Sequence, residues 1–523
     1  MAAASSVAVL LLCETARGEQ KFYPDDPVWK MPAPLPLKAP HTRKIDQLYD
    51  FVLNSAATPG EKQLPGHLIP AADVNTLGEV PDSTWYTNRQ YRHRMSIEEL
   101  RRGPVDQGPP SPPFRIVGTK TEGITPGFQM EDSKGRRYLC KPDPESDPEM
   151  ATAADVIGSK FFYAFGYNVP QNFILYVTPE QLSIDASAKV AGVNGKERAL
   201  NGHDLHHILL RVPRDQQGRY RFMASFHIPG KAVGPFRWYG VRRDDPEDFY
   251  LHENRRALRG LYVFCSWLNH TDIKANNTYD AIQKVEGNDA IVHYLIDFGA
   301  SLGSDSDEAK NARFGHEYMI EKDKKVLLRM AAGGFYSPDW ERANFPDIPG
   351  VGHFEAETFH AGNWTSNYPN AAFLNRLPDD IFWAAKQVMA FTREEIRAMV
   401  ETGEFSDPKA VDYIAGTLEK RQQKIGRYAF SQVLPLDHFA VRDGKLLFED
   451  LGAKYGFSPP RDYRVKWHRF DNTTSQSTPI ESAASMLVPR EQGYLMAEIS
   501  GSGAKLIRVY VHGQDVVGIE RTW

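Results

Sequence analysis

Two short runs of polar residues carry side chains suited to chemistry on a phosphate group. The first is HTDIKANN, at residues 270–277, and the second is DFG, at residues 297–299. They offer a candidate base in Asp272, a cation in Lys274, and two candidate ligands for a divalent metal in Asn277 and Asp297. Phosphoryl transfer asks little covalent chemistry of a protein, which must hold the metal on the phosphates, orient a hydroxyl and neutralise charge. This order of residues therefore predicts phosphotransfer chemistry.

Both runs resemble motifs of the protein-kinase-like superfamily. HTDIKANN is similar to the kinase catalytic loop H-R-D-L-K-x-x-N, and it departs from that loop at Thr271, which replaces Arg, and at Ile273, which replaces Leu. The DFG motif is intact. The chance that both patterns occur at this distance by accident is roughly 1 in 10⁵ at average residue usage. The resemblance implies a bilobal fold that uses ATP with Mg²⁺ or Mn²⁺.

The resemblance also implies a role for each polar residue. Asp272 would accept or orient the proton of the attacking hydroxyl, and Lys274 would offer a cation to the transferred phosphoryl group. Asn277 and Asp297 would hold Mg²⁺ or Mn²⁺, which prefer hard oxygen ligands. Asn276 is an alternative ligand, although the spacing favours Asn277.

Lys141 closes a predicted strand in the sequence Tyr-Leu-Cys-Lys-Pro. It resembles the kinase lysine that reaches the α- and β-phosphates, and an ordinary lysine at a sheet edge is the alternative interpretation. Its partner is expected to be an acid on the following helix. We expect Glu149, at the start of that helix, with Glu145 and Asp155 as rivals.

The loop between the first two predicted strands departs from the kinase pattern. It reads GTKTEGITPG over residues 118–127, where kinases have G-x-G-x-x-G. Thr121, Gly123 and Thr125 are the candidate phosphate contacts, because backbone amides and hydroxyls of such a loop can cradle phosphate. A plain hairpin loop is an equally good interpretation.

Other departures restrict the branch of the superfamily. No A-P-E motif follows DFG, and the segment 300–375 is long and rich in Gly, Asn and aromatic residues. This layout resembles the atypical bacterial branch, with HipA-like, CotH-like and secreted Golgi casein-kinase-like enzymes. The expected activity is phosphoryl transfer to a hydroxyl of a protein, glycan or small molecule. A nucleotide-binding pseudokinase or scaffold, and an AMP transferase on the same fold, are the alternatives.

Periodicity predicts the elements that position these residues. Helical stripes run from Glu149 to Gly166 and over Glu253–Leu268, and the second leads directly into HTDIKANN. An apolar strand, Ile291–Ile296, ends at Asp297. The strands expected before the first helix are Phe114–Thr119, Phe128–Glu131 and Arg137–Lys141.

The chain divides into five expected segments of an α+β protein. They are a signal peptide over 1–18, an extended Pro-rich arm over 19–112, a kinase-like N-lobe over 113–235, a C-lobe over 236–435 and a small all-β domain over 436–523. Helix starts are expected at Thr392-x-x-Glu395, a capping box, and at Asp407-Pro408. Alternating apolar residues predict the strands of the last segment.

Composition restricts partners and location. A net charge of −5 over 523 residues gives no footprint for nucleic acid, and no apolar run approaches the ~20 residues of a membrane span. The apolar start MAAASSVAVLLLC favours export, periplasmic or secreted, and without a signal a cytoplasmic location is expected. Export would require a local supply of ATP or a different phosphoryl donor. Cys140 and Cys265 are expected to be buried thiols.

Overall fold

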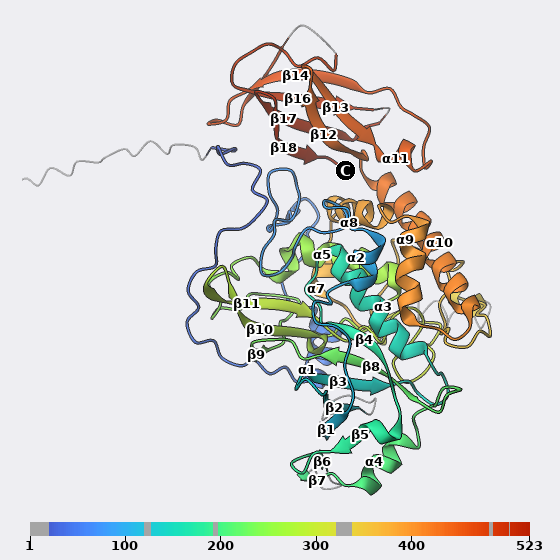
Figure 1. The fold of residues 1–523 in the computed structure, drawn as a ribbon. Coiled ribbons are helices and arrows are strands. Elements are labelled where there is room, and N and C mark those ends of the chain that lie inside the picture. Colours follow the sequence, from blue (N-terminus) through green and yellow to red (C-terminus); the bar gives the residue numbers. More distant parts are fainter. Residues whose placement is uncertain (1–19, 120–126, 192–196, 321–336, 481–484, 502) are drawn as a thin grey trace, which may run out of the picture.

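A six-stranded sheet forms one part of the protein (Figure 1). The computed structural model describes residues 20–119, 127–191, 197–320, 337–480, 485–501 and 503–523. The strands lie in the order β4-β8-β3-β2-β1-β5, antiparallel except for the β1–β5 pair. Their bounds are β1 Phe114–Thr119, β2 Phe128–Glu131, β3 Arg137–Pro142, β4 Asn172–Val177, β5 Leu182–Ile184 and β8 Tyr220–Phe226.

The alternation of side chains along β3 separates the core from the site. Tyr138 and Cys140 point into an apolar cluster that also contains Phe128 and Phe222. Successive side chains of a strand point to opposite faces, so Lys141 lies on the other face, where α3 (Met150–Phe165) packs. Helix α3 ends at Gly166, whose φ of 119° and close contact with Tyr86 leave no room for a Cβ.

A small insertion follows β5 at the edge of this sheet. It consists of the strand pair β6 and β7 and the helix α4, which lie together at one end of the molecule (Figure 1). The bounds are β6 Lys189–Ala191, β7 Glu197–Ala199 and α4 Gly202–Leu209. A 3₁₀ turn, η1 (Pro179–Gln181), lies between β4 and β5.

Helices dominate the next part of the chain. Helix α5 (Arg256–Leu268) is buried along its whole length and packs against α8 and α10. The capping box at Thr392 and the helix start at Asp407-Pro408 are confirmed. The other helices are α7 Ala371–Leu374, α8 Pro378–Met389, α9 Arg393–Val400 and α10 Pro408–Gln432, and the 3₁₀ turns are η2 His252–Asn254, η3 Ala275–Asn277, η4 Asp339–Arg342 and η5 Glu401–Gly403.

A three-stranded sheet, in the order β11-β10-β9, lies beside these helices. Its strands are β9 Lys231–Gly234, β10 Thr278–Val285 and β11 Asn288–Leu295. HTDIKANN therefore connects α5 to β10, and DFG follows β11. The hairpin of β10 and β11 holds the ends of both loops in one register, since Thr278 pairs with Leu295.

The C-terminal segment forms a separate β module, with its own apolar core around Trp467, Val465 and Val509 (Figure 1). The strands predicted there by alternation are confirmed, but a helical turn, α11 (Leu451–Lys454), means that the segment is not all-β. The strands are β12 Leu436–Arg442, β13 Lys445–Asp450, β14 Arg464–Phe470, β15 Ser477–Pro479, β16 Tyr494–Ser500, β17 Leu506–His512 and β18 Asp515–Arg521.

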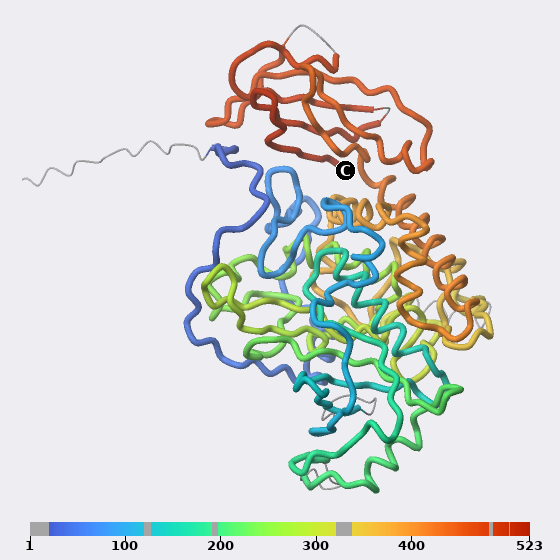
Figure 2. Tube along the Cα trace, in the orientation of Figure 1, coloured from blue at the N-terminus to red at the C-terminus, as the bar shows by residue number. Residues whose placement is uncertain are grey.

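The segment before β1 runs over the surface of the other parts (Figure 2). Phe22 packs among Phe470, Met496 and Tyr510 of the β module. Farther along, the segment forms α1 (Gln47–Ala57) and α2 (Ile97–Arg102). The predicted segment boundaries remain predictions.

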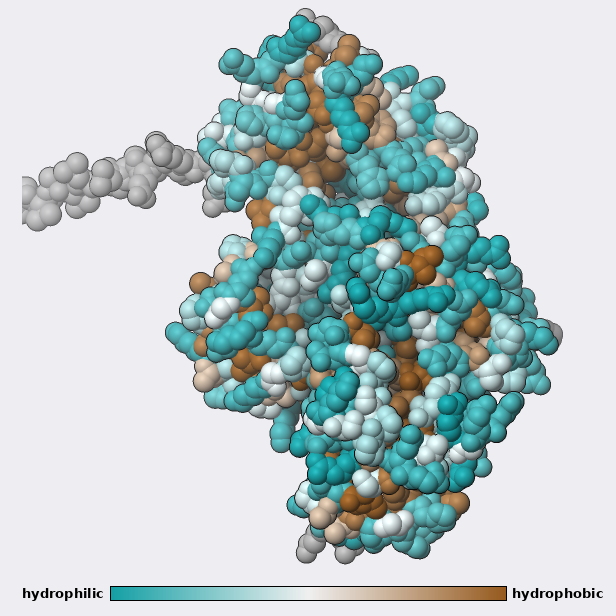
Figure 3. All heavy atoms as spheres, viewed as in Figure 1, coloured by the Kyte–Doolittle hydropathy of each residue, from teal (hydrophilic) through white to brown (hydrophobic). Residues whose placement is uncertain are grey.

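The arrangement of helices and sheets agrees with the predicted α+β class. Cys140 and Cys265 are buried thiols, as expected, whereas Cys13 and the predicted signal peptide lie outside the described residues. Hydrophilic residues predominate on the face shown in Figure 3, with smaller groups of hydrophobic residues between them. In the described part of the chain, no helix combines the length and the apolar character that a membrane span requires.

Candidate functional site

The HTDIKANN loop is held by hydrogen bonds between its own polar side chains. Lys274 Nζ lies 2.9 Å from Asp272 Oδ2. The side-chain amide of Asn277 donates through Nδ2 to the Asp272 carbonyl at 2.8 Å and to Asp272 Oδ2 at 3.1 Å. Because the amide nitrogen points at Asp272, its oxygen points away. The loop thus fixes a carboxylate, an ammonium group and an amide oxygen relative to one another.

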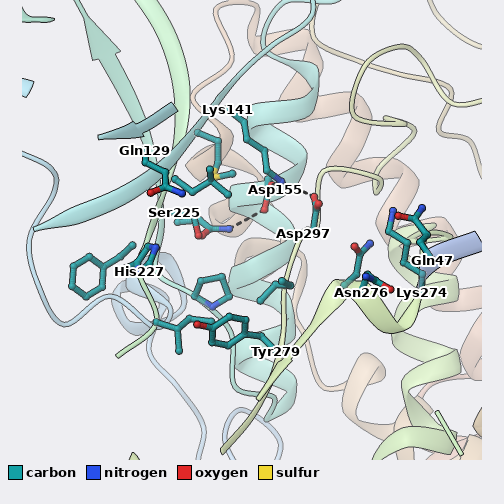
Figure 4. Close-up of a pocket in the computed structure, with 18 residues that line it drawn as sticks. Gln47, Gln129, Lys141, Asp155, Ser225, His227, Lys274, Asn276, Tyr279 and Asp297 are labelled. Atoms are coloured by element: carbon teal, nitrogen blue, oxygen red, sulfur yellow. Dashed lines mark hydrogen bonds and ion pairs between the residues drawn. The ribbon is translucent and has the colours of Figure 1, made fainter. Parts of the chain in front are cut away.

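The first residue of DFG meets the lysine of strand β3. Asp297 follows β11 with a φ of 63°, in the left-handed region that few non-glycine residues adopt. Lys141 Nζ donates to Asp297 Oδ1 at 2.7 Å and lies 3.5 Å from Asp155 Oδ2 (Figure 4). Residues 141, 155 and 297 therefore form a charged cluster from three separate elements.

The partner of Lys141 on helix α3 is Asp155, so the expected pairing with Glu149 is wrong. Glu149 precedes the helix with a φ of 70°, and its Oε2 accepts hydrogen bonds from the backbone and hydroxyl of Ser406, at 2.8 and 3.1 Å. Asp155 lies farther along the helix, on the face toward the sheet, where Asn172 Nδ2 donates to its Oδ1 at 2.8 Å. Glu145, the other rival, is exposed.

Burial and charge act against each other in this cluster. Burial alone would lower the pKa of Lys141, but the carboxylates of Asp297 and Asp155 outweigh it and raise that pKa above its usual value. Burial raises the pKa of Asp155 to about 6, although Lys141 opposes the shift. Lys141 is therefore a cation at neutral pH, and Asp155 depends on it to remain ionised.

These groups surround one cavity of about 450 Å³ (Figure 4). A space of this size suits a small ligand, and it combines apolar walls with a few polar groups. Asp272 does not line it but is hydrogen-bonded to two residues that do. The lining residues are Gln47, Gln129, Leu139, Lys141, Asp155, Pro170, Asn172, Met223, Ser225, Phe226, His227, Ile228, Lys274, Asn276, Asn277, Tyr279, Ile296 and Asp297.

One wall of the cavity comes from an unexpected source. Gln47, at the start of α1, lines the cavity on the side of Lys274 and Asn276 (Figure 4). Asn276 Nδ2 donates to the carbonyl of Ile45 at 3.2 Å, which ties this segment to the HTDIKANN loop. The sequence contains no motif that places α1 here. Thr121, Gly123 and Thr125, the predicted phosphate contacts, lie outside the described residues.

The oxygen donors of the cavity suit a hard divalent cation. Asp297 offers a carboxylate and Asn277 an amide oxygen, and both line the cavity. Among the residues that the structure describes, no group of three or more His, Cys, Asp or Glu side chains could hold a metal on its own. This set fits Mg²⁺ or Mn²⁺ bound together with phosphate oxygens and water, since such ions are usually held by one or two carboxylates plus substrate phosphates.

Comparison with known proteins adds a distant likeness to solved structures. No family model and no curated protein matches the sequence. Among solved structures, the chain is similar to one titled "Crystal structure of the golgi casein kinase", with 11% identity, a TM-score of 0.28, and coverage of 64% of this chain and 75% of that chain. A likeness this distant carries no argument, so the site is interpreted from its own geometry.

Proposed function

We propose that this protein is an ATP-dependent phosphotransferase with a kinase-like arrangement of its site. With Mg²⁺ or Mn²⁺, it would transfer a phosphoryl group to a hydroxyl of a protein, glycan or small molecule. The observation that carries the proposal is that one cavity gathers Lys141, Asp297 and Asn277 beside Asp272. These residues lie up to 156 positions apart in the sequence, and together they supply the phosphate-binding cation, the metal ligands and the base that phosphoryl transfer needs.

Each residue has a task that follows from its position. Leu139, Met223 and Ile296 offer apolar surface for the base of a nucleotide. Lys141, held between two carboxylates, would bind phosphate oxygens. Asn277 and Asp297 would hold the metal, which neutralises charge on the phosphates when bound.

The acceptor side of the reaction belongs to the HTDIKANN loop. Asp272 would accept or orient the proton of the hydroxyl, in the position that the Asn277 amide fixes. Lys274, 2.9 Å from Asp272, would place its charge near the transferred group. The presence of all these groups around one cavity favours an active enzyme over a pseudokinase. Phosphoryl and AMP transfer require the same metal ligands.

Calorimetric titration of the full chain with ATP tests the nucleotide site. We expect binding in Mg²⁺ or Mn²⁺ that disappears in EDTA and in Asp297→Ala. The control is Asp289→Ala, on strand β11, because Asp289 is exposed and pairs only at the surface with Lys284. No binding under any metal, or equal loss in both variants, would contradict the proposal.

Labelled ATP separates the two transfer reactions. Label from the γ-phosphate should appear in the acceptor if the protein transfers a phosphoryl group, and label from the α-phosphate if it transfers AMP. Nucleotide binding without transfer of either label to any acceptor from a panel of proteins, glycans and polyols would favour the pseudokinase alternative.

A further inference from the structure

At Thr271 the HTDIKANN loop has a neutral side chain where the similar kinase loop has a positive charge. The similar kinase loop has Arg there. Thr271 is fully buried, and its hydroxyl accepts a hydrogen bond from Lys310 Nζ at 2.8 Å. A cation from another part of the chain therefore lies against this position.

Lys310 reaches the loops of both motifs. Its Nζ also donates to the carbonyl of Ala300, directly after DFG, at 3.1 Å and lies 3.7 Å from Asp305 Oδ1. The side chain is 1% exposed. The three N–H groups of the ammonium thus face three oxygens, two of them on the loops that carry Asp272 and Asp297.

The backbone of Lys310 is held as firmly as its side chain. Its N–H donates to the carbonyl of Gly303 at 2.8 Å, and its carbonyl lies 2.7 Å from His353 Nδ1. The segment before it is anchored too, since the N–H of Leu302 donates to the Leu268 carbonyl at 2.8 Å. Lys310 cannot follow a displaced loop without breaking these contacts.

The neighbouring histidine does not supply the charge. Burial lowers the pKa of His270 to about 4, so the imidazole is neutral at pH 7. Burial also lowers the pKa of Lys310, while the carboxylates of Asp305 and Asp272 oppose that shift. His270 Nδ1 lies 3.3 Å from the Ala300 carbonyl that Lys310 also contacts.

We propose that Lys310 is a positioning residue that joins the loop of Asp272 to the loop of Asp297 and sets the distance between base and metal ligand. This inference rests on the proposed function. Its physical basis is the sensitivity of a reacting site to geometry, in which a misplacement of about 1 Å costs on the order of 10²-fold in rate. The bridge uses two of the three N–H groups of one buried ammonium.

Lys386 provides a matched control, because it is also a buried lysine between oxygens. It is 3% exposed, pairs with Glu79 and lies 2.8 Å from Asp437 Oδ2. These partners belong to the surface segment and to the β module rather than to the cavity. Loss of Lys386 should therefore reduce stability as a buried lysine does, without acting on the site.

The experiment compares Lys310→Met, Lys310→Arg and Lys386→Met in the full chain. For Lys310→Met we expect kcat to fall by about 10²-fold per folded molecule, while the KM for ATP changes much less. Lys310→Arg should recover part of this loss, because it restores a donor to both oxygens. Lys386→Met should keep kcat near the wild-type value. Thr271→Val, which removes only the hydroxyl acceptor, replaces Lys310→Met if that variant does not fold.

Hydrogen exchange keeps the test independent of turnover. Two backbone hydrogen bonds report on these loops: the amide of Leu302, after DFG, donates to the Leu268 carbonyl at the end of α5, and the amide of Asn367 donates to the Thr271 carbonyl. Both amides should exchange faster in Lys310→Met and Thr271→Val than in Lys386→Met. Unchanged exchange would overturn the inference even for an active enzyme. If exchange is faster in these variants but the wild-type protein shows no turnover, the inference that Lys310 joins the two loops is supported and the proposed phosphotransferase activity is rejected.

Discussion

Replacing Lys141 by methionine should lower the free energy of unfolding, because it leaves the buried carboxylate of Asp155 without its cation. Asp155 is 3% exposed, and Lys141 is the cation beside it. Without that cation, Asp155 must stay ionised in a dry site or take up a proton. Breaking a buried ion pair in this way costs about 3–5 kcal/mol.

Protonation of Asp155 makes the loss depend on pH. In wild type the pKa of Asp155 is about 6, so at 1.36 kcal/mol per pH unit the extra proton of the variant costs about 2 kcal/mol at pH 7.5 and almost nothing at pH 5, where wild type already holds that proton. The folded state then holds a proton that the unfolded state lacks, so stability falls as pH rises above 3.9. Lys141→Met should therefore be much more destabilising at pH 7.5 than at pH 5.

A second substitution separates stability from binding. Lys141→Met with Asp155→Asn removes both fully buried charges and leaves only Asp297, which is 34% exposed, so its free energy of unfolding should lie within about 1 kcal/mol of wild type at both pH values. Calorimetry should still detect no metal-dependent binding of ATP, because the cation for the phosphates is missing.

Urea titrations at the two pH values measure these differences. The control is Lys284→Met. Lys284 pairs with Asp289 at the surface, where the two side chains are 69% and 53% exposed. Loss of this pair should lower the free energy of unfolding by less than about 1 kcal/mol. The reasoning is refuted if Lys141→Met costs no more than Lys284→Met at pH 7.5, or if the double variant is as unstable as the single one.

Three further changes test other parts of the structure. Burial lowers the pKa of Lys160 to about 8, so the stability of wild type rises with pH between about 8 and 10.5 as the buried lysine loses its proton. Lys160→Met should therefore be more stable than wild type by about 2 kcal/mol at pH 7. Urea titration should find that this difference has disappeared by pH 10.5. Asp155→Asn should weaken metal-dependent ATP binding in calorimetry, whereas Glu149→Gln should not, because Asp155 alone of the two contacts Lys141; equal effects would contradict the assignment. Phe22→Ala leaves a cavity in the apolar cluster that Phe22 forms with Phe470, Met496 and Tyr510, at a cost of about 3–5 kcal/mol. It should speed proteolysis near residue 22; an unchanged cleavage rate would show that the ring does not hold this segment.

The polar loops are predictable from the sequence because their geometry is local. The side chains of the HTDIKANN loop form hydrogen bonds within the loop, in which Lys274 and Asn277 donate to Asp272. Its flanking helix and strands have clear periodicity, and capping signals such as Thr392 mark helix starts. A short-range pattern of this kind contains most of the information that fixes the loop.

The partner of Lys141 was harder to predict, because it depends on which face of α3 meets the sheet. Proximity in sequence favours Glu149, but that residue precedes the helix and turns toward Ser406. Nearly every side chain of α3 is buried, so amphipathic periodicity gives no guide. A different signal was present: Asp155 is the one acid in the sequence of Met150–Phe165, and a buried acid requires a partner.

Gln47 and Lys310 depend on tertiary structure alone. Gln47 enters the cavity because α1 packs against the turn at Ala275–Asn277, which no spacing in the sequence reveals. Lys310 lies in a region without periodicity or motif, and its importance follows only from the two loops that it reaches. Contacts between segments far apart in the chain are what local patterns cannot supply.

The contact of Phe22 with the β module also restricts the order of events during synthesis. Its N–H donates to Asn472 Oδ1 at 2.8 Å, across 450 residues. The segment that also carries Gln47 leaves the ribosome early, yet one of its anchoring partners is among the last to be made. Pairings of such long range form late. We therefore expect the Phe22 end of this segment to stay unanchored through most of translation, until the β module has been made, whereas the part around Gln47 gains its partner at Asn276 earlier.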